Sequence, residues 1–539
     1  MINGYVIALI VFLAYLGLIY VLKRTKWLDR HSMSLQGPLL LWKTRRGKAF
    51  IDRVASKRRF WSWYGKVALW VCLLSMIAIM VLLIWEATIV PQIKTAPSPQ
   101  LVLGIPGINP IIPIGYGILG LVVAIVVHEF AHGILTRAGG MKVQSLGLVF
   151  LVFPIGAFVE PDEKDIQEAT RSKRAKLYAA GPGTNIMLSL VVLSLFSGVF
   201  MSSLEPTHEG ALISVTTGGV VVGSPAERSG LTANSVVVSI DGTSISSATD
   251  LDSRVSPHPG ALVTVSYYYA GQLRSVNMTD GLVVAFTTSG FAAANASLET
   301  GMVLTSLNDT VIGGDLALRS VMAHTHAGQT INVTAMSYDS STGRFVVNSS
   351  ISTIKLSDKF QYYEKFDPAQ NSPDYHGVGF LGAGFSNLGM QVENASYYQE
   401  ALAQPFKGDR SFTDYSFSAL RLIALPFLHL APLRTPVTDI YHPAHALSWM
   451  PDSAFWILAN SLYWIFWLNL MVGLTNVLPA VPLDGGYLFR DFMDYLLSKT
   501  GRTYTKEQRD RIVGKVVLAL ALVVLGLILW QLVGPALNH

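Results

Sequence analysis

The stretch VVAIVVHEFAHGILTRAGG, residues 122–140, places three ionisable side chains, His128, Glu129 and His132, in an otherwise apolar segment. Two histidines four residues apart project from one face of a helix, so both imidazoles can bind one zinc ion. Glu129 directly follows the first histidine, where its carboxylate can take a proton from a water molecule at the metal. Such groups in a membrane helix cost several kcal/mol unless they are paired or bind a metal. The stretch therefore predicts a zinc site on a membrane helix, in preference to a polar face packed inside a helical bundle.

The composition of the whole chain agrees with a membrane location. Of its 539 residues, 51% are hydrophobic and 14% are charged, whereas soluble proteins carry about 25% charged residues. The single cysteine, Cys72, excludes an intramolecular disulfide framework and a cysteine-rich zinc module.

Six segments are apolar and long enough to cross a bilayer, which takes about 20 residues. They are 4–22, 67–90, 111–135, 184–201, 455–478 and 513–533. A shorter apolar stretch, 417–430, contains a charge and a proline, so we expect an interfacial or re-entrant helix there. The first segment has basic residues only after it, unlike a secretory signal peptide, so we expect a retained span whose N-terminus lies outside.

The distribution of Lys and Arg predicts the orientation of these spans. Segments 23–66, 137–176 and 490–515 hold 13, 7 and 7 of the 40 basic residues, whereas the long stretch 203–452 holds only 12. By the positive-inside rule the three dense clusters face the cytoplasm. Both termini and the long stretch are therefore expected outside.

The long stretch also holds every Asn-x-Ser/Thr sequon of the chain, which agrees with an extracytoplasmic face. The sequons are at Asn277, Asn295, Asn308, Asn332, Asn348 and Asn394. Six sequons without a disulfide suit an archaeal plasma membrane. We expect a multi-pass protein of the plasma membrane, in contact with the lipid bilayer and with no nucleic-acid partner.

A catalytic zinc normally has three protein ligands and a water molecule, so the two histidines need a third partner. The other acidic residue near the end of a span is Asp484, in the stretch NVLPAVPLDGG, residues 476–486. Asp-Gly is a common turn dipeptide, and a turn that ends a span is the alternative reading. However, the third and fifth proposed spans both run from outside to inside, and both carry these groups late. Asp484 is therefore expected at the depth of the histidines, toward the cytoplasmic leaflet.

The long stretch contains a repeat of short alternating runs separated by Gly, Asn and Asp, which predicts strands. Residues 231–245 align with residues 298–312 at an offset of 67, and the stretch SPAERSGL, residues 224–231, followed by SIDG, residues 239–242, resembles the core of a PDZ domain. We therefore expect two tandem PDZ-like domains, 213–278 and 281–354. Such domains bind an extended peptide by strand addition. A steric filter that keeps bulky ectodomains away is the alternative role, and both stay open.

With both motifs in place, the chain resembles the site-2 protease family of intramembrane zinc metalloproteases, which carries HExxH on one membrane helix and LDG on a later one. The resemblance implies that His128, His132 and Asp484 bind one zinc ion per chain and that Glu129 is the general base. The match spans roughly residues 111–185 and 468–492, plus the PDZ-like insert.

Other family elements imply contacts with the substrate. The stretch FPIGAFVE, residues 153–160, resembles the membrane-inserted hairpin of the family, and GPGTN, residues 181–185, resembles its GP..N element. Asn476 lies where the family has a substrate-contacting asparagine. The implied substrate-binding residues are Phe153, Gly156, Asn185 and Asn476.

The expected fold is a polytopic α-helical membrane protein of about six spans, with a β-rich extracytoplasmic insert of two PDZ-like domains. The expected domains are a two-span region with a basic cytoplasmic loop (1–110), the HExxH span with its hairpin and the next span (111–203), the two PDZ-like domains (213–278 and 281–354), a linker with an interfacial helix (355–452), and the LDG and C-terminal spans (453–539).

The expected function is intramembrane zinc endopeptidase activity on membrane-protein substrates, as in regulated intramembrane proteolysis, with peptide segments held by the PDZ-like domains. A catalytically silent peptide receptor is the alternative. A metal transporter is a second alternative, which is weakened because the site is isolated and no trail of polar residues continues along the other spans.

Overall fold

The computed structural model describes residues 4–44, 47–93, 97–102, 104–151, 153–215, 218–405, 420–500 and 504–537, without the side chains of 4–9, 11, 29, 102 and 153–155. The chain divides into two compact units. The helical unit comprises Met1–Gly198, Ala419–Pro432 and Ile457–His539, and the β-rich unit comprises Val199–Ser418 and Leu433–Trp456.

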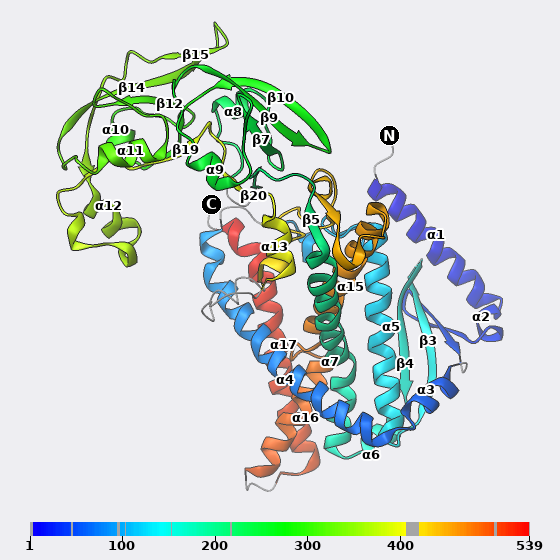
Figure 1. Ribbon diagram of the computed structural model, residues 1–539. Coiled ribbons are helices and arrows are strands. Elements are labelled where there is room, and N and C mark those ends of the chain that lie inside the picture. The colour runs from blue at the N-terminus through cyan, green and yellow to red at the C-terminus, as the bar shows by residue number, and fades with distance from the viewer. Residues whose placement is uncertain are drawn as a thin grey trace. The chain divides into compact units, whose positions relative to one another are not determined.

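Long apolar helices dominate the helical unit (Figure 1). Each of the six predicted spans coincides with a helix: α1 (Gly4–Arg24), α4 (Arg58–Ile89), α5 (Ile114–Ala138), α7 (Arg171–Leu195), α15 (Asp452–Asn476) and α17 (Lys506–Leu537). Among the described residues, five helices are long and apolar enough to cross a membrane, and α1 is not one of them. A membrane protein is therefore supported, whereas the count of six spans stays a prediction.

Exposed apolar side chains on these helices fit a lipid environment. Along α4, Trp70, Leu74 and Ile77 are each 60% exposed or more, which water would penalise and hydrocarbon does not. Where helices contact each other, small residues allow close approach, as is usual in membranes. A Cβ atom on Gly120 of α5 would lie 2.6 Å from the backbone oxygen of Trp464 on α15, so these two helices touch through their backbones.

The predicted hairpin is part of a larger sheet. Strands β3 (Val143–Leu151) and β4 (Phe153–Pro161) form the hairpin, and β1 (Met33–Gln36) and β2 (Leu39–Thr44) extend it in the order β1-β2-β3-β4. All pairs are antiparallel. Because β4 stands at the end of the order, it is an edge strand. The strand lies beside α5 (Figure 1). The N-terminal region, for which the sequence offered no functional role, therefore supports the hairpin.

An ion pair fastens this sheet across three strands. Lys43 of β2 lies 3.0 Å from the carboxylate of Glu160 on β4, which also accepts a hydrogen bond from Ser145 of β3. The hydrogen bond from Ser145, with the charge of Lys43, holds the pKa of the Glu160 carboxyl below its ordinary value. The carboxylate form therefore favours the assembled sheet.

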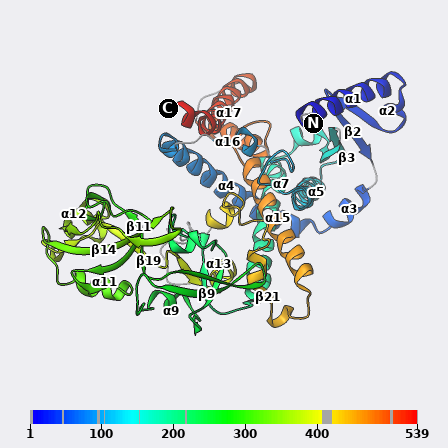
Figure 2. The same ribbon diagram turned by 90° about the horizontal axis from the view of Figure 1, so that it is seen from above.

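The two larger sheets of the β-rich unit are built from the same elements (Figure 2). The first has the order β10-β9-β7-β6-β20 and the second β15-β14-β12-β11-β19. The strands along the first order are β6 (Ala211–Ile213), β7 (Val236–Ile240), β9 (Leu262–Tyr269), β10 (Gln272–Thr279) and β20 (Val392–Asn394). Those along the second are β11 (Leu282–Thr287), β12 (Val303–Leu307), β14 (Thr330–Asp339), β15 (Arg344–Val347) and β19 (Ala383–Asn387). In addition, β8 (Thr243–Ser244) pairs with β7, β13 (Thr310–Val311) with β12, and β16 (Thr353–Lys355) with β14. Strand β12 begins 67 residues after β7, the offset of the sequence repeat.

The second sheet is nested within the first. The chain leaves the first sheet after β10, builds the whole second sheet, and returns from β19 to add β20 beside β6. Each sheet therefore includes a strand beyond the ranges 213–278 and 281–354 predicted for the PDZ-like domains. Where the chain passes from the first sheet to the second, the buried Asp280 accepts two hydrogen bonds of 2.7 and 2.8 Å from Arg254. The PDZ-like identity of the two sheets stays a prediction.

Candidate metal centre

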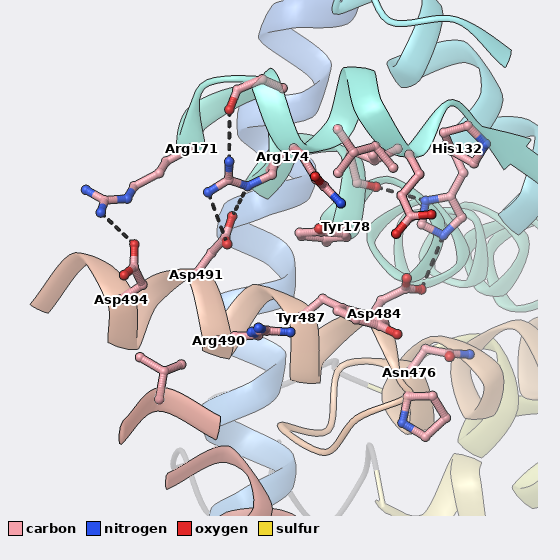
Figure 3. Close-up of a pocket in the computed structure, with 18 of the residues that line it drawn as sticks. His132, Arg171, Arg174, Tyr178, Asn476, Asp484, Tyr487, Arg490, Asp491 and Asp494 are labelled. Atoms are coloured by element: carbon pink, nitrogen blue, oxygen red, sulfur yellow. Dashed lines mark hydrogen bonds and ion pairs between the residues drawn. The ribbon is translucent and has the colours of Figure 1, made fainter. Parts of the chain in front are cut away.

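Three potential ligand atoms converge in the helical unit. Nε2 of His128 and Nε2 of His132 lie 3.1 and 3.2 Å from Oδ2 of Asp484, and 3.1 Å from each other. Figure 3 shows His132 and Asp484 pointing toward one another. Ligands of a tetrahedral zinc, at about 2.0–2.1 Å from the metal, are about 3.3 Å apart. The triangle therefore fits three corners of a zinc site and leaves one corner for water or substrate.

Distant segments of the chain supply these atoms. His128 and His132 are on one face of α5, and Asp484 is the first residue of α16 (Asp484–Lys499), just beyond the loop that ends α15. Gly486 follows closely, and a Cβ atom there would lie 2.5 Å from the backbone of Ala480. The Asp-Gly-Gly sequence is therefore required by the close return of this loop, which brings Asp484 to the histidines.

Helix α7 forms the back wall of the site. A Cβ atom on Gly181 would lie 2.5 Å from Nε2 of His128 and closer still to Nε2 of His132. The Leu177 carbonyl oxygen of the same helix is 2.8 Å from Nδ1 of His132. Since a carbonyl only accepts, Nδ1 of His132 carries the proton and its Nε2 is free to bind a metal.

Glu129 lies at the boundary between the helix and the sheet. Its Oε2 accepts a hydrogen bond of 2.9 Å from the backbone N–H of Val159 on β4. That N–H therefore points away from β3, toward the free edge of the strand. The general base predicted from the sequence is thus held next to the edge at which another strand could pair.

Two cavities meet at Glu129. One, of about 1100 Å³, is lined by the three candidate ligand residues and Asn476, and by a ring of charged residues further out. The other, of about 1340 Å³, runs along the sheet and is lined by Leu148, Ala157 and Phe158. Both include Val159. The site is therefore reached by a polar route and by a second route along the strands.

Ion pairs hold α16 against α7 at the polar cavity (Figure 3). Arg174 contacts both carboxylate oxygens of Asp491 at 2.8 and 3.3 Å, and Arg171 contacts Asp494 at 2.6 Å. Because Asp484 begins α16, these contacts also fix the helix that carries the third candidate ligand.

The structure separates the four predicted substrate-binding residues. Asn476 lines the polar cavity, and its Nδ2 donates to the Val472 carbonyl oxygen. Gly156 lies on β4 opposite Val149, and Phe153 begins that strand with its side chain outside the described residues. Asn185 lies elsewhere: it is completely buried, 3.3 Å from Nδ1 of His128, and lines neither cavity.

Comparison with known proteins places this site in a family. Residues 116–524, about three quarters of the chain, match peptidase family M50. The chain belongs to peptidase family M50. This is the site-2 protease family that the two motifs resemble, and the matched range includes the histidines, the sheet strands β3 and β4, and Asp484.

Two curated relatives match this M50 chain over shorter segments. An uncharacterised protein of Methanocaldococcus jannaschii is 40% identical over 88 residues, which are 16% of this chain and 24% of that protein. The zinc metalloprotease RasP of Shouchella clausii is 28% identical over 128 residues, 23% of this chain and 28% of that protein. The chain thus spans about a quarter of the length of the relatives it matches. Zinc is the metal named for RasP, and the His-His-Asp triangle of this M50 chain is compatible with it.

Sequence reasoning missed three features of the M50 site. The Leu177 carbonyl and the Val159 N–H are backbone groups, so no residue type marks them. Gly181 was noted within GPGTN, but its place against the histidines depends on how α7 packs on α5. Gly and Pro together inside an apolar helix are the one available signal, since they permit close backbone approach.

Proposed function

We propose that this M50 chain is an intramembrane zinc metalloendopeptidase that hydrolyses peptide bonds in or near transmembrane segments of membrane proteins. The triangle of His128, His132 and Asp484, with Glu129 beside it, carries this proposal. A receptor without catalytic activity would have no use for a carboxylate at the first position after a ligand. We find nothing in the site that favours that alternative.

The side chains divide the chemistry among them. A bound zinc ion would polarise a water molecule and the scissile carbonyl. Glu129 accepts the proton of that water and passes it to the nitrogen of the leaving amine. Asp484 and the two histidines hold the metal, and Leu177 orients one of the imidazoles. The polar cavity supplies water from the side on which the charged ring lies.

The substrate backbone needs partners before it can be cut. A helix buries its carbonyls in its own hydrogen bonds, and unwound backbone is expensive in lipid. The free edge of β4 can pair with an extended substrate segment, since edge strands present unpaired N–H and C=O groups. Asn476, in the polar cavity, would hold the segment on the other side. This arrangement supports cleavage of a locally unwound segment that lies beside β4.

Selection of substrates is assigned to the β-rich unit. We propose that its two sheets, as PDZ-like domains, lie outside the plasma membrane and bind peptide segments of the substrate or exclude bulky ectodomains. The site itself would lie toward the cytoplasmic leaflet. The surface exposure of Asn277 and Asn332 in these sheets, and of Asn295 at the end of α10 (Ala292–Asn295), is compatible with glycosylated sequons.

The decisive experiment compares wild type with Glu129→Gln in vesicles that contain a single-span substrate. We expect cleavage by the wild type, suppression of that cleavage by a zinc chelator, and at least a thousand-fold slower cleavage by the variant, about the size of a lost general base. Zinc content should be equal in both proteins. Equal cleavage rates would reject the mechanism, and absence of cleavage by both, with zinc bound, would favour the silent receptor.

A further inference from the structure

Asn185 and His128 form a contact that neither the ligand set nor the family match explains. Nδ2 of Asn185 lies 3.3 Å from Nδ1 of His128, the ring nitrogen on the opposite side from Asp484. The side chain is completely buried on α7, and its Oδ1 has no hydrogen-bond partner among the described residues. A buried amide oxygen without a partner is costly, so this site calls for an explanation.

The two histidines differ in the group that contacts their Nδ1 atom. The Leu177 carbonyl at His132 accepts only, which leaves Nε2 of that ring free for a metal. The amide of Asn185 offers both a donor and an acceptor. When Nδ2 donates to Nδ1 of His128, that ring must carry its proton on Nε2, from which it donates to Asp484 and cannot bind a metal.

Rotation of the amide by half a turn exchanges its nitrogen and oxygen with little change in shape. Oδ1 would then accept the Nδ1–H of His128, and Nε2 would present its lone pair toward His132 and Asp484. The orphaned oxygen gains its partner in the same step. Metal-bound histidines commonly donate their other N–H to such an acceptor, which fixes the tautomer and the ring orientation.

We propose that Asn185 is a positioning residue for the metal, whose amide oxygen holds the Nε2 lone pair of His128 toward the ion. Helix α7 then sets the tautomers of both histidines, through the Leu177 backbone and, about two turns later, through the Asn185 side chain. The inference rests on the proposed zinc site, but it assigns Asn185 to metal binding in place of the substrate contact expected from the sequence.

Zinc affinity of the purified full-length protein tests this role without any cleavage assay. Competition with a chelator should show about 10- to 100-fold weaker zinc binding for Asn185→Leu, the usual effect of losing such a partner. Asn185→Asp should retain affinity, because a carboxylate also accepts from Nδ1. The matched control is Asn469→Leu: Asn469 is equally buried on α15 and also has an Oδ1 without a partner among the described residues, but it does not contact the site. Its zinc affinity should be unchanged.

A second readout separates positioning from stability. The absorption spectrum of the cobalt-substituted protein should change for Asn185→Leu and stay as in wild type for Asn185→Asp. Wild-type zinc affinity in Asn185→Leu, with only KM raised, would overturn the proposal and restore the substrate contact. If Asn185→Leu does not fold, Asn185→Asp decides alone: a loss of zinc affinity in that variant rejects the acceptor role. Failure of the protease proposal would instead appear as a wild type that binds zinc and does not cleave.

Discussion

Gly181 of α7 faces His128 of α5 so closely that a Cβ atom on the glycine would lie 2.5 Å from Nε2, the candidate metal-binding atom. That distance is scarcely longer than a zinc–nitrogen bond of about 2.0–2.1 Å. A methyl group at this position would therefore overlap the Nε2 atoms of both imidazoles, the atoms that face the candidate metal site. The bare backbone of α7 is therefore part of the candidate metal site, although it supplies no ligand.

We therefore predict that Gly181→Ala abolishes zinc binding. Zinc content, measured after purification, should fall from one ion per chain to near zero, with cleavage lost in parallel. Gly526→Ala is the matched control, because Gly526 lies on the membrane helix α17 with open space around its Cβ position. Full zinc occupancy in Gly181→Ala would show that α7 can move away at little cost.

The outward N–H groups of β4 give a sharp test of strand addition. The N–H of Val159 points to the free edge, and alternation along the strand places the N–H of Ala157 on the same edge. Ala157→Pro removes that N–H donor and breaks no hydrogen bond to β3. Cleavage should therefore fall by about tenfold or more, which is the effect of one lost hydrogen bond of about 1.4 kcal/mol. Ala157→Val keeps the N–H and should cleave nearly normally.

Both Ala157 variants should retain zinc, which separates substrate pairing from metal binding. A proline on β3 is less informative, because β3 lies between β2 and β4 and pairs with both. Undiminished cleavage by Ala157→Pro would rule out pairing at this edge.

The Arg174–Asp491 pair should contribute to stability and to metal retention. Both side chains are less than 20% exposed. The coupling free energy of the pair should therefore be larger than for a surface ion pair and smaller than for a fully buried one, at about 2 kcal/mol. Thermal unfolding of Arg174→Ala, Asp491→Ala and the double variant in detergent would measure it as a double-mutant cycle. Zinc should dissociate faster from each single variant, since α16 carries Asp484.

A comparison pair lies in the β-rich unit. Arg319 and Asp315 form an exposed i,i+4 pair, with 77% and 38% exposed side chains, and Asp315→Ala should leave both unfolding temperature and zinc retention unchanged. A coupling energy near zero for Arg174 and Asp491 would contradict their role in holding α16.

Cysteine labelling can test the predicted orientation, because the single native cysteine, Cys72, is buried. In a Cys72→Ala background, Ser340→Cys on the exposed end of β14 and β15 should react with a membrane-impermeant maleimide in intact cells. Glu168→Cys, on an exposed segment before α7, should react only after permeabilisation. The reverse pattern would overturn the assignment of the β-rich unit to the outside.

The sequence by itself determined the local features of this protein. The length of the apolar segments and the i,i+4 spacing of His128 and His132 are visible in neighbouring residues, and the repeat at an offset of 67 is visible when two short segments are compared. Helical and strand periodicity turn such patterns into structure without reference to the rest of the chain. The M50 family match agrees with this reading over residues 116–524.

Only the tertiary structure decided which groups from distant segments lie at the candidate metal site. Asp484 could have been a turn residue, and it becomes a candidate ligand because α16 starts 3.1 Å from His128, 356 residues away. The roles of Gly181 and Val159, and the return of β20 into the first sheet, also depend on how distant segments pack. Backbone donors leave no mark in a residue pattern, and a glycine shows only that a close approach is permitted, so which groups meet follows from packing alone.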